Sequence, residues 1–177
     1  MAVKYKLQDV SKLTGRDIFV DANVLIYLFW STGGSWEQKY ASAFARLYKQ
    51  QNSMFVDFWT IAEVINGAMR IEHKKQQESL LTTTKYKDFR DSAEGRNTLK
   101  DIYSVIKEQV LKQFKVAGKA YEQQDIESFL VVDELDFMDK SIVNICKDNN
   151  FVLLTNDNDF GNVDVDILTA NSRLLNP

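Results

Sequence analysis

Residues 17–29 read Asp-Ile-Phe-Val-Asp-Ala-Asn-Val-Leu-Ile-Tyr-Leu-Phe. The run opens with Ile18-Phe19-Val20, whose β-branched and aromatic side chains favour a strand. Asp21 closes that strand, and the apolar stretch from Val24 to Phe29 favours a helix. A short strand that is apolar throughout and leads at once into a helix is typical of a parallel sheet covered on both faces.

The same alternation continues along the chain. We expect further strands at 53–58, 128–132, 151–155 and 164–168, and helices at 36–51, 60–73, 97–117 and 135–148. No Pro/Gly/Ser-rich linker divides the sequence, and its single proline is Pro177. The pattern predicts one domain over residues 1–177, an α/β fold of three layers (α/β/α) with a central parallel sheet of about five strands. An extended helical region is expected at about 73–126.

Composition narrows the class of protein. The chain is 45% hydrophobic and 27% charged, which is typical of a globular protein. Its one cysteine excludes a disulfide within the chain and a cysteine-based zinc site. Residues 1–9 lack the apolar stretch of a secretory signal, and 24–30 is too short to span a bilayer, so we expect a cytoplasmic protein without membrane contact. The net charge of −3 argues mildly against tight non-specific nucleic-acid binding, although an acidic site would itself lower the charge.

Acidic side chains follow two of the predicted strands. Asp21 ends the first, and Asp157 and Asp159 follow the strand at 151–155. Parallel strands end at one edge of the sheet, where such folds place their functional groove. An Asp in this position often caps the next helix, which explains either residue alone. Two such positions with Asn23 and Asn156 beside them favour a functional site.

Asp139 is the strongest candidate for a functional acidic residue. On a helix of 3.6 residues per turn it falls inside an apolar stripe made by Leu135, Met138, Ile142, Ile145 and Cys146. A carboxylate on a core-facing stripe is costly unless it is ion-paired or binds a metal. A buried ion pair is therefore the alternative to a catalytic role. Asp136, nearer the margin of the stripe, either supports the site or is solvated.

Glu63 begins a predicted helix in the pattern Thr60-x-x-Glu63, which matches a capping box. The helical wheel places it opposite the apolar face, beside Gly67 and Arg70. It therefore faces either water or a groove at the same sheet edge. A capping role and a functional role are compatible.

Four converging acids would raise one another's pKa unless a cation neutralised them. Oxygen ligands without His or Cys suit Mg²⁺ or Mn²⁺, which can activate water and stabilise charge on a phosphodiester. His73 lies in a polar, lysine-rich stretch and is expected to be a solvated surface residue, whereas Cys146 is expected in the core. No Gly-rich phosphate loop or Gly-x-Ser-x-Gly elbow is present, and a single His argues against a Ser-His-Asp triad.

Four segments together resemble PIN-domain nucleases. Residues 17–26 resemble the family's opening strand with Asp-x-Asn, 60–63 its second acidic position, 139–146 its third, and 153–160 its closing Thr-x-Asp-x-Asp-Phe. They occur in the family's order and span most of the chain. Each motif is weak by itself, but the ordered set is fairly specific.

The resemblance implies a Mg²⁺- or Mn²⁺-dependent endoribonuclease. Its metal-binding acids would be Asp21, Glu63, Asp139 and Asp157, with Asp159 as an accessory acid. Asn23 and Thr155 would be supporting polar residues that orient the ligands. Many small bacterial members are toxins of the VapC type, often dimers, inhibited by a small antitoxin protein. The resemblance therefore implies an RNA substrate and raises an antitoxin partner and a homodimer as expectations.

The chain departs from the compact toxins in two places. It carries residues ahead of the first strand and extra polar, helical sequence between Glu63 and Asp139. The extra region holds basic side chains: Arg70, Lys74, Lys75, Lys85, Lys87, Arg90 and Arg96. Such a run is either a solvated face or a rim that guides RNA phosphates.

Two other functions compete with the nuclease. The acidic net charge and long extra helix fit a non-catalytic scaffold or partner-binding protein with the same fold. A metal-dependent phosphatase or DNA nuclease would use a similar sheet. An aspartyl-phosphate phosphatase is expected to have Asp-x-Asp after the first strand. This chain has Asn23 in place of the second Asp, which weakens that alternative.

Overall fold

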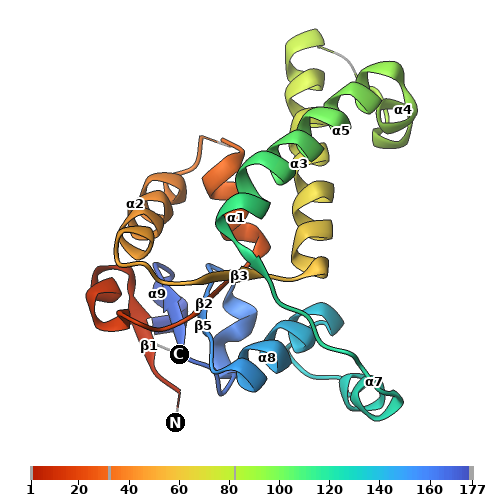
Figure 1. Ribbon diagram of the computed structural model, residues 1–177. Helices are drawn as coiled ribbons and strands as arrows, with labels where there is room; N and C mark the ends of the chain where they lie inside the picture. Colours follow the sequence, from red (N-terminus) through yellow and green to blue (C-terminus); the bar gives the residue numbers. More distant parts are fainter. Residues whose placement is uncertain (1, 32, 82, 176–177) are drawn as a thin grey trace.

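A computed structural model describes residues 2–31, 33–81 and 83–175 (Figure 1). Over these residues the fold is α/β, with a six-stranded parallel sheet in the order β1-β6-β5-β2-β3-β4. The strands are β1 (Lys4–Lys6), β2 (Ile18–Val20), β3 (Met54–Val56), β4 (Lys115–Val116), β5 (Val152–Leu154) and β6 (Ile167–Thr169). The expected parallel α/β architecture is confirmed.

The two edge strands were not expected. β1 and β4 are short and carry lysines, so neither has the apolar run by which a buried strand is recognised. The strand expected at 128–132 is wrong. That segment is the end of a helix, α7 (Gln123–Phe129), and a loop in which Val132 is 99% exposed. The helix expected at 97–117 also ends earlier, because Lys115 and Val116 pair with β3.

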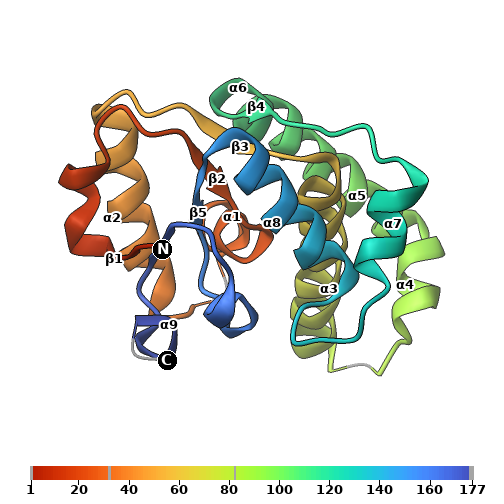
Figure 2. The ribbon, with the colours of Figure 1, turned by 90° about the horizontal axis from the view of Figure 1, so that it is seen from below.

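Helices lie on both faces of the sheet. The α-helices before the extension are α1 (Ala22–Phe29), α2 (Trp36–Lys49) and α3 (Phe58–Leu80). Those after it are α7, α8 (Phe137–Asn149) and α9 (Ser172–Leu175), with 3₁₀ turns η1 (Leu7–Leu13) and η3 (Asn158–Asn162). Alternate residues of β2 face opposite ways. Ile18 and Val20 pack in the core with α1, α2 and α3, whereas Phe19 packs in a second core with α8. Figures 1 and 2 show the resulting three layers.

A helical extension projects from the sheet (Figure 1). It comprises the distal part of α3, then α4 (Tyr86–Asp91) and α5 (Ala93–Val105), which continues through a π-helical turn (Ile106–Val110) into α6 (Leu111–Gln113). The expectation that His73 is solvated is wrong. It is 8% exposed, its Nε2 lies 2.8 Å from the carbonyl of Thr84, and its ring stacks on Phe89. Because α3 continues past His73 to Leu80, α4 can fold back over this ring.

The order of the strands reverses around β2. From β2 the chain adds β3 and β4 on one side, and then crosses to add β5 and β6 on the other. Such a reversal opens a crevice at the carboxyl ends of the strands, where ligands bind in open α/β sheets. In the described part of the chain, no helix is both long enough and apolar enough to cross a membrane.

Candidate active site

Asp21 is the buried centre of the candidate site. It follows β2 directly, caps α1 by accepting a hydrogen bond from the Ala22 N–H at 2.7 Å, and is 5% exposed. Its Oδ2 accepts from Asn23 Nδ2 at 2.5 Å and from Thr155 Oγ1 at 2.6 Å. The cap considered from the sequence is therefore real, and it coexists with a second oxygen held by two side chains.

Burial is the largest influence on Asp21 and raises its pKa to about 7. The hydrogen bond from Thr155 lowers the pKa, and the charges of Glu63 and Asp157 raise it further. A carboxyl group in this setting favours a neutral state or a bound cation. These electrostatic effects also place Glu63 and Asp157 near Asp21 in space.

Asp139 lies in the first turn of α8 and is half-buried. Burial raises its pKa to about 7, and the charges of Asp136, Asp21 and Asp157 add to the shift. The buried ion pair considered for Asp139 is not found, because none of the described lysines or arginines forms a salt bridge with it. Asp136 is exposed and caps α8, accepting from the N–H groups of Met138 and Asp139.

The capping box considered for Thr60 and Glu63 is not formed. The helix α3 begins two residues earlier, at Phe58, and its N-cap is Asp57, whose Oδ1 accepts from the Thr60 N–H at 2.7 Å. Glu63 therefore lies in the second turn and has no capping role. Partial burial raises its pKa, and Asp136, Asp157 and Asp57 raise it further.

Asp157 and Asp159 follow β5 but occupy different positions. The Asp157 N–H donates to Thr155 Oγ1 at 3.0 Å, and its carboxylate caps η3 by accepting from the Asp159 N–H at 3.1 Å. The charge of Asp157 raises the pKa of Asp21, Glu63 and Asp139. Asp159 is exposed on η3 and is not among the main charges that act on those three acids.

Asp57 and Tyr40 are residues that sequence reasoning missed. Asp57 ends β3, is 2% exposed, and has an Oδ2 that finds no hydrogen-bond partner among the described residues. An acid directly after a strand is the signal that identified Asp21, and it could have identified Asp57 as well. Tyr40 of α2 is fully buried. Its hydroxyl lies 2.9 Å from both the Thr155 carbonyl and Asn156 Oδ1, and it accepts from the Ala170 N–H. Tyr40 looked like an ordinary core residue of an apolar helix face.

The donor chemistry of the cluster fits a hard divalent cation. Asp21, Glu63, Asp139 and Asp157 offer carboxylate oxygens, which hard cations prefer, and the cation would relieve the mutual repulsion that raises three of their pKa values. The buried Asp57 Oδ2 adds an unpartnered oxygen on the neighbouring strand end. Over the ranges that the structure describes, no three acidic, His or Cys side chains form a closed ligand set.

Comparison with known proteins assigns the family. The PIN-domain profile matches residues 18–166, which contain all four acids. The chain belongs to the PIN-domain family. PIN domains are a family of nucleases, and they generally use divalent metals. The crystal structure of PAE2754 from Pyrobaculum aerophilum is similar at 19% identity and a TM-score of 0.49, covering 90% of this chain and 88% of that one. A search of curated proteins gives no match.

The basic residues of this PIN domain lie at different distances from the acids. Arg70 lies two turns after Glu63 on α3, and both residues line a cavity of about 440 Å³. Lys74 and Lys75 lie about 16–18 Å from Glu63 along the helix. They face Glu78 and Glu72 of their own helix, at 3.8 and 2.9 Å. Lys85 and Lys87 lie at the exposed start of α4. Of these five cations, Arg70 alone borders the acidic cluster.

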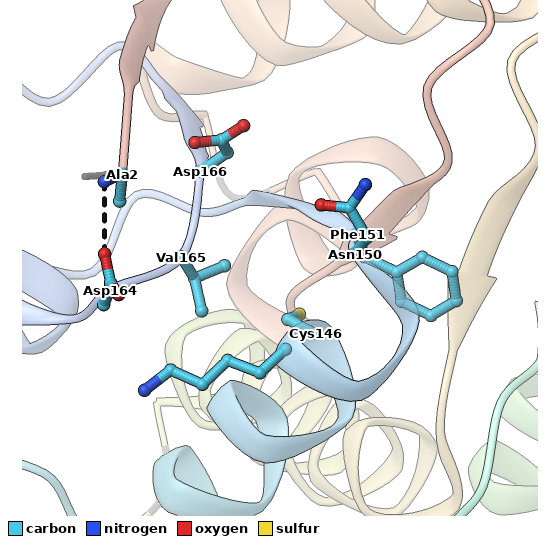
Figure 3. A pocket seen from close by; sticks show the side chains of 8 residues that line it. Ala2, Cys146, Asn150, Phe151, Asp164, Val165 and Asp166 are labelled. Carbon is cyan, nitrogen blue, oxygen red and sulfur yellow. Dashed lines mark hydrogen bonds between the residues drawn. The ribbon is translucent and has the colours of Figure 1, made fainter.

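A separate cavity of about 340 Å³ lies where β5 and β6 begin, at the opposite edge of the sheet (Figure 3). Asn150, Phe151 and Asp164 line it, and the Ala2 N–H donates to Asp164 Oδ1 at 3.1 Å. Burial raises the pKa of the Cys146 thiol at its floor, so this side chain stays protonated and unreactive. None of the four acids lines this cavity.

Proposed function

We propose that this PIN domain is a metal-dependent endoribonuclease. The observation that carries the proposal is the buried Asp21 carboxylate, whose pKa is raised to about 7 at the sheet edge where Glu63 and Asp157 add their charges. Strongly perturbed acids clustered at a topological switch point are typical of catalytic sites. Membership of a nuclease family supports the same reaction class.

The four acids have distinct supports. Asp21 is fixed from two sides, by Asn23 on α1 and by Thr155, which directly follows β5. Asp139 is positioned by the first turn of α8, and Glu63 by the second turn of α3. With Asp157, they would hold Mg²⁺ or Mn²⁺. When bound, such an ion supplies an activated water and stabilises the charge of the phosphodiester as it reacts.

The supporting residues would prepare Asp21 for this role. Because the Thr155 hydroxyl and the Asn23 amide both donate to Oδ2, they favour the charged carboxylate that a cation requires. Hydrolysis forms one P–O bond to the water oxygen and breaks the P–O bond to the leaving sugar oxygen. The water gives up a proton and the leaving oxygen gains one.

The test is cleavage of a mixed single-stranded RNA pool with Mg²⁺, with Mn²⁺, and with chelator. We expect metal-dependent cutting by the wild type, reduced at least about 100-fold in Asp139→Asn. Asp148→Asn is the matched control, since Asp148 is exposed in the last turn of the same helix. Circular dichroism shows that each variant folds.

Two further arms separate the competing functions. Single-stranded DNA and a small phosphate ester are offered under the same conditions, and faster turnover of either would favour a DNA nuclease or a phosphatase. Equal RNA cleavage by wild type and Asp139→Asn would contradict the proposal. An inactive wild type that shows no Mg²⁺ or Mn²⁺ binding by calorimetry would instead favour a non-catalytic scaffold.

A further inference from the structure

An apolar pocket lies beside the acidic cluster, between the start of α3, α7 and the start of α8. Its volume is about 250 Å³. Its walls are mainly aromatic: Trp59, Tyr121, Ile126, Phe129, Phe137 and Met138. In both ribbon views α7 lies next to α8 at this place (Figures 1 and 2). We call it the aromatic pocket.

Two rings of the aromatic pocket are open to solvent, whereas Phe129 is 8% exposed. Trp59 is 48% exposed and Phe137 is 46% exposed. Phe137 packs edge-on against Phe129 at 5.6 Å, and Phe129 packs edge-on against Tyr121 at 5.7 Å. Exposed aromatic surface gathered in a concave site indicates a ligand, because the core would otherwise bury it. Tyr121, Phe129 and Phe137 therefore support one another in the pocket wall, and Trp59 packs edge-on against Phe58 at 5.3 Å.

The aromatic pocket shares two wall residues with a neighbouring cavity that one of the four acids, Glu63, lines. A second cavity, of about 440 Å³, is lined by Trp59, Glu63, Asn66, Arg70 and Met138. Trp59 and Met138 belong to both cavities. Glu63, Asn66 and Arg70 follow one another at intervals of three and four residues, so they share one face of α3. The Glu63 carboxylate and the Arg70 guanidinium therefore lie on one face of α3, beside the Trp59 ring that both cavities share.

Gly67 lies where α3 packs closely against α1. A Cβ at this position would lie 2.7 Å from the Cδ1 of Ile26 on α1. The glycine therefore allows α1 and α3 to approach closely, and this approach brings the acid of α3 toward the carboxyl end of β2.

We propose that the aromatic pocket binds an unpaired nucleobase of the RNA substrate next to the bond that is cut, while Arg70 contacts a backbone phosphate. The inference rests on the proposed function and defines its substrate class as single-stranded RNA. Aromatic rings stack on any base, and a nearby cation follows the backbone, which is the combination that single-strand binders use. A base within a duplex is already stacked and cannot enter. The small volume suits one ring system rather than a helix of a protein partner.

The test measures binding without cleavage, using the full chain carrying Asp139→Asn. Its probes are a fluorescently labelled oligoadenylate, an abasic sugar–phosphate oligomer of equal length, and a duplex. We expect oligoadenylate to bind most tightly. Adding Trp59→Ala should weaken oligoadenylate binding about tenfold and remove its advantage over the abasic oligomer. Trp59→Phe should retain most of the advantage. Tyr48→Ala is the control, because Tyr48 is 61% exposed and borders a cavity at the opposite sheet edge.

Several outcomes would overturn the inference. Equal affinity for oligoadenylate and the abasic oligomer would show that no base is recognised, and unchanged binding in Trp59→Ala would place recognition elsewhere. If Trp59→Ala alters the oligomeric state and leaves RNA binding intact, the pocket is a contact between copies of the chain. The nuclease proposal is tested separately, by RNA cleavage with the wild-type protein. Either the nuclease proposal or the base-binding proposal can therefore fail alone.

Discussion

The Thr155 hydroxyl donates a hydrogen bond to Asp21 Oδ2 at 2.6 Å, joining two residues that are 134 positions apart in the chain. The contact crosses from the end of β5 to the end of β2, which are neighbours in the sheet. Thr155 Oγ1 also accepts from the Asp157 N–H. One hydroxyl therefore orients one acid and positions the backbone of another.

Replacing Thr155 with Val removes this hydroxyl at nearly constant volume. We expect RNA cleavage to fall about 10–100-fold, as for other residues that orient metal ligands. Because the lost hydrogen bond lowers the pKa of Asp21, the acid limb of the pH–rate profile should move to higher pH. Thr169→Val is the matched control, since Thr169 ends β6 and is equally buried but does not contact Asp21. An equal loss in both variants, with no shift in the profile, would indicate general destabilisation instead.

The stability of the metal-free protein should decrease as pH rises. Asp21 and Asp139 have folded-state pKa values of about 7, above their ordinary value of 3.8. Below about pH 4 both carboxyl groups are protonated in the folded and in the unfolded state, so they do not change the free energy of unfolding. Between about pH 4 and 7 only the unfolded chain loses these protons, which favours unfolding. We therefore expect these groups to lower the Tm as the pH rises from about 4 to about 7, with no further effect above that range.

Thermal unfolding of two variants tests whether Asp139 causes this decrease in Tm with pH. Asp139→Asn should flatten the decline, whereas Asp148→Asn should leave it unchanged. Excess Mg²⁺ at about pH 8 should raise the wild-type Tm, because it binds the charged carboxylates of the folded state. A decline that persists unaltered in Asp139→Asn, together with no response to Mg²⁺ or Mn²⁺, would contradict the assignment of Asp139 to this cluster.

Tyr40→Phe should destabilise the protein where the segments after β5 and β6 meet α2. The change leaves the buried Thr155 carbonyl and the Ala170 N–H without the hydroxyl that they share. Leaving such groups unsatisfied costs about 1–3 kcal/mol, which urea unfolding would measure as a lower midpoint at unchanged slope. Tyr103→Phe, at an exposed position on α5, is the control. A midpoint equal to that of the wild type would show that Tyr40 contributes by packing alone.

Gly95→Ala should disturb the extension without altering the catalytic chemistry. An added Cβ would lie 2.0 Å from the backbone oxygen of Phe89, so α4 and α5 must separate. We expect a loss of about 1–3 kcal/mol and a lower Tm. Gly118→Ala serves as control, since open space surrounds that position. RNA cleavage measured well below the Tm should remain near the wild-type rate, and its loss would assign the extension a direct role in the reaction.

The sequence by itself determined the elements that bury apolar runs. Ile18 to Val20 and Val152 to Leu154 are buried strands, and their apolar side chains leave no other favourable environment. Asp21 and Asp157 could be predicted to share an edge because each follows such a strand. The edge strands β1 and β4 could not be predicted, since their polar residues form strands only through pairing with a neighbour.

The tertiary structure decided which polar residues act together. The local pattern at Thr60 and Glu63 allowed a capping box, but Asp57 caps the helix and leaves Glu63 in the second turn. Local rules also assigned His73 to the surface, whereas the ring is covered by α4. Burial, hydrogen bonds from Thr155 and Tyr40, and the aromatic pocket all depend on segments more than 50 residues apart. Sequence periodicity predicts which face of a helix or strand is apolar. Only the tertiary packing determines which residues the polar face contacts.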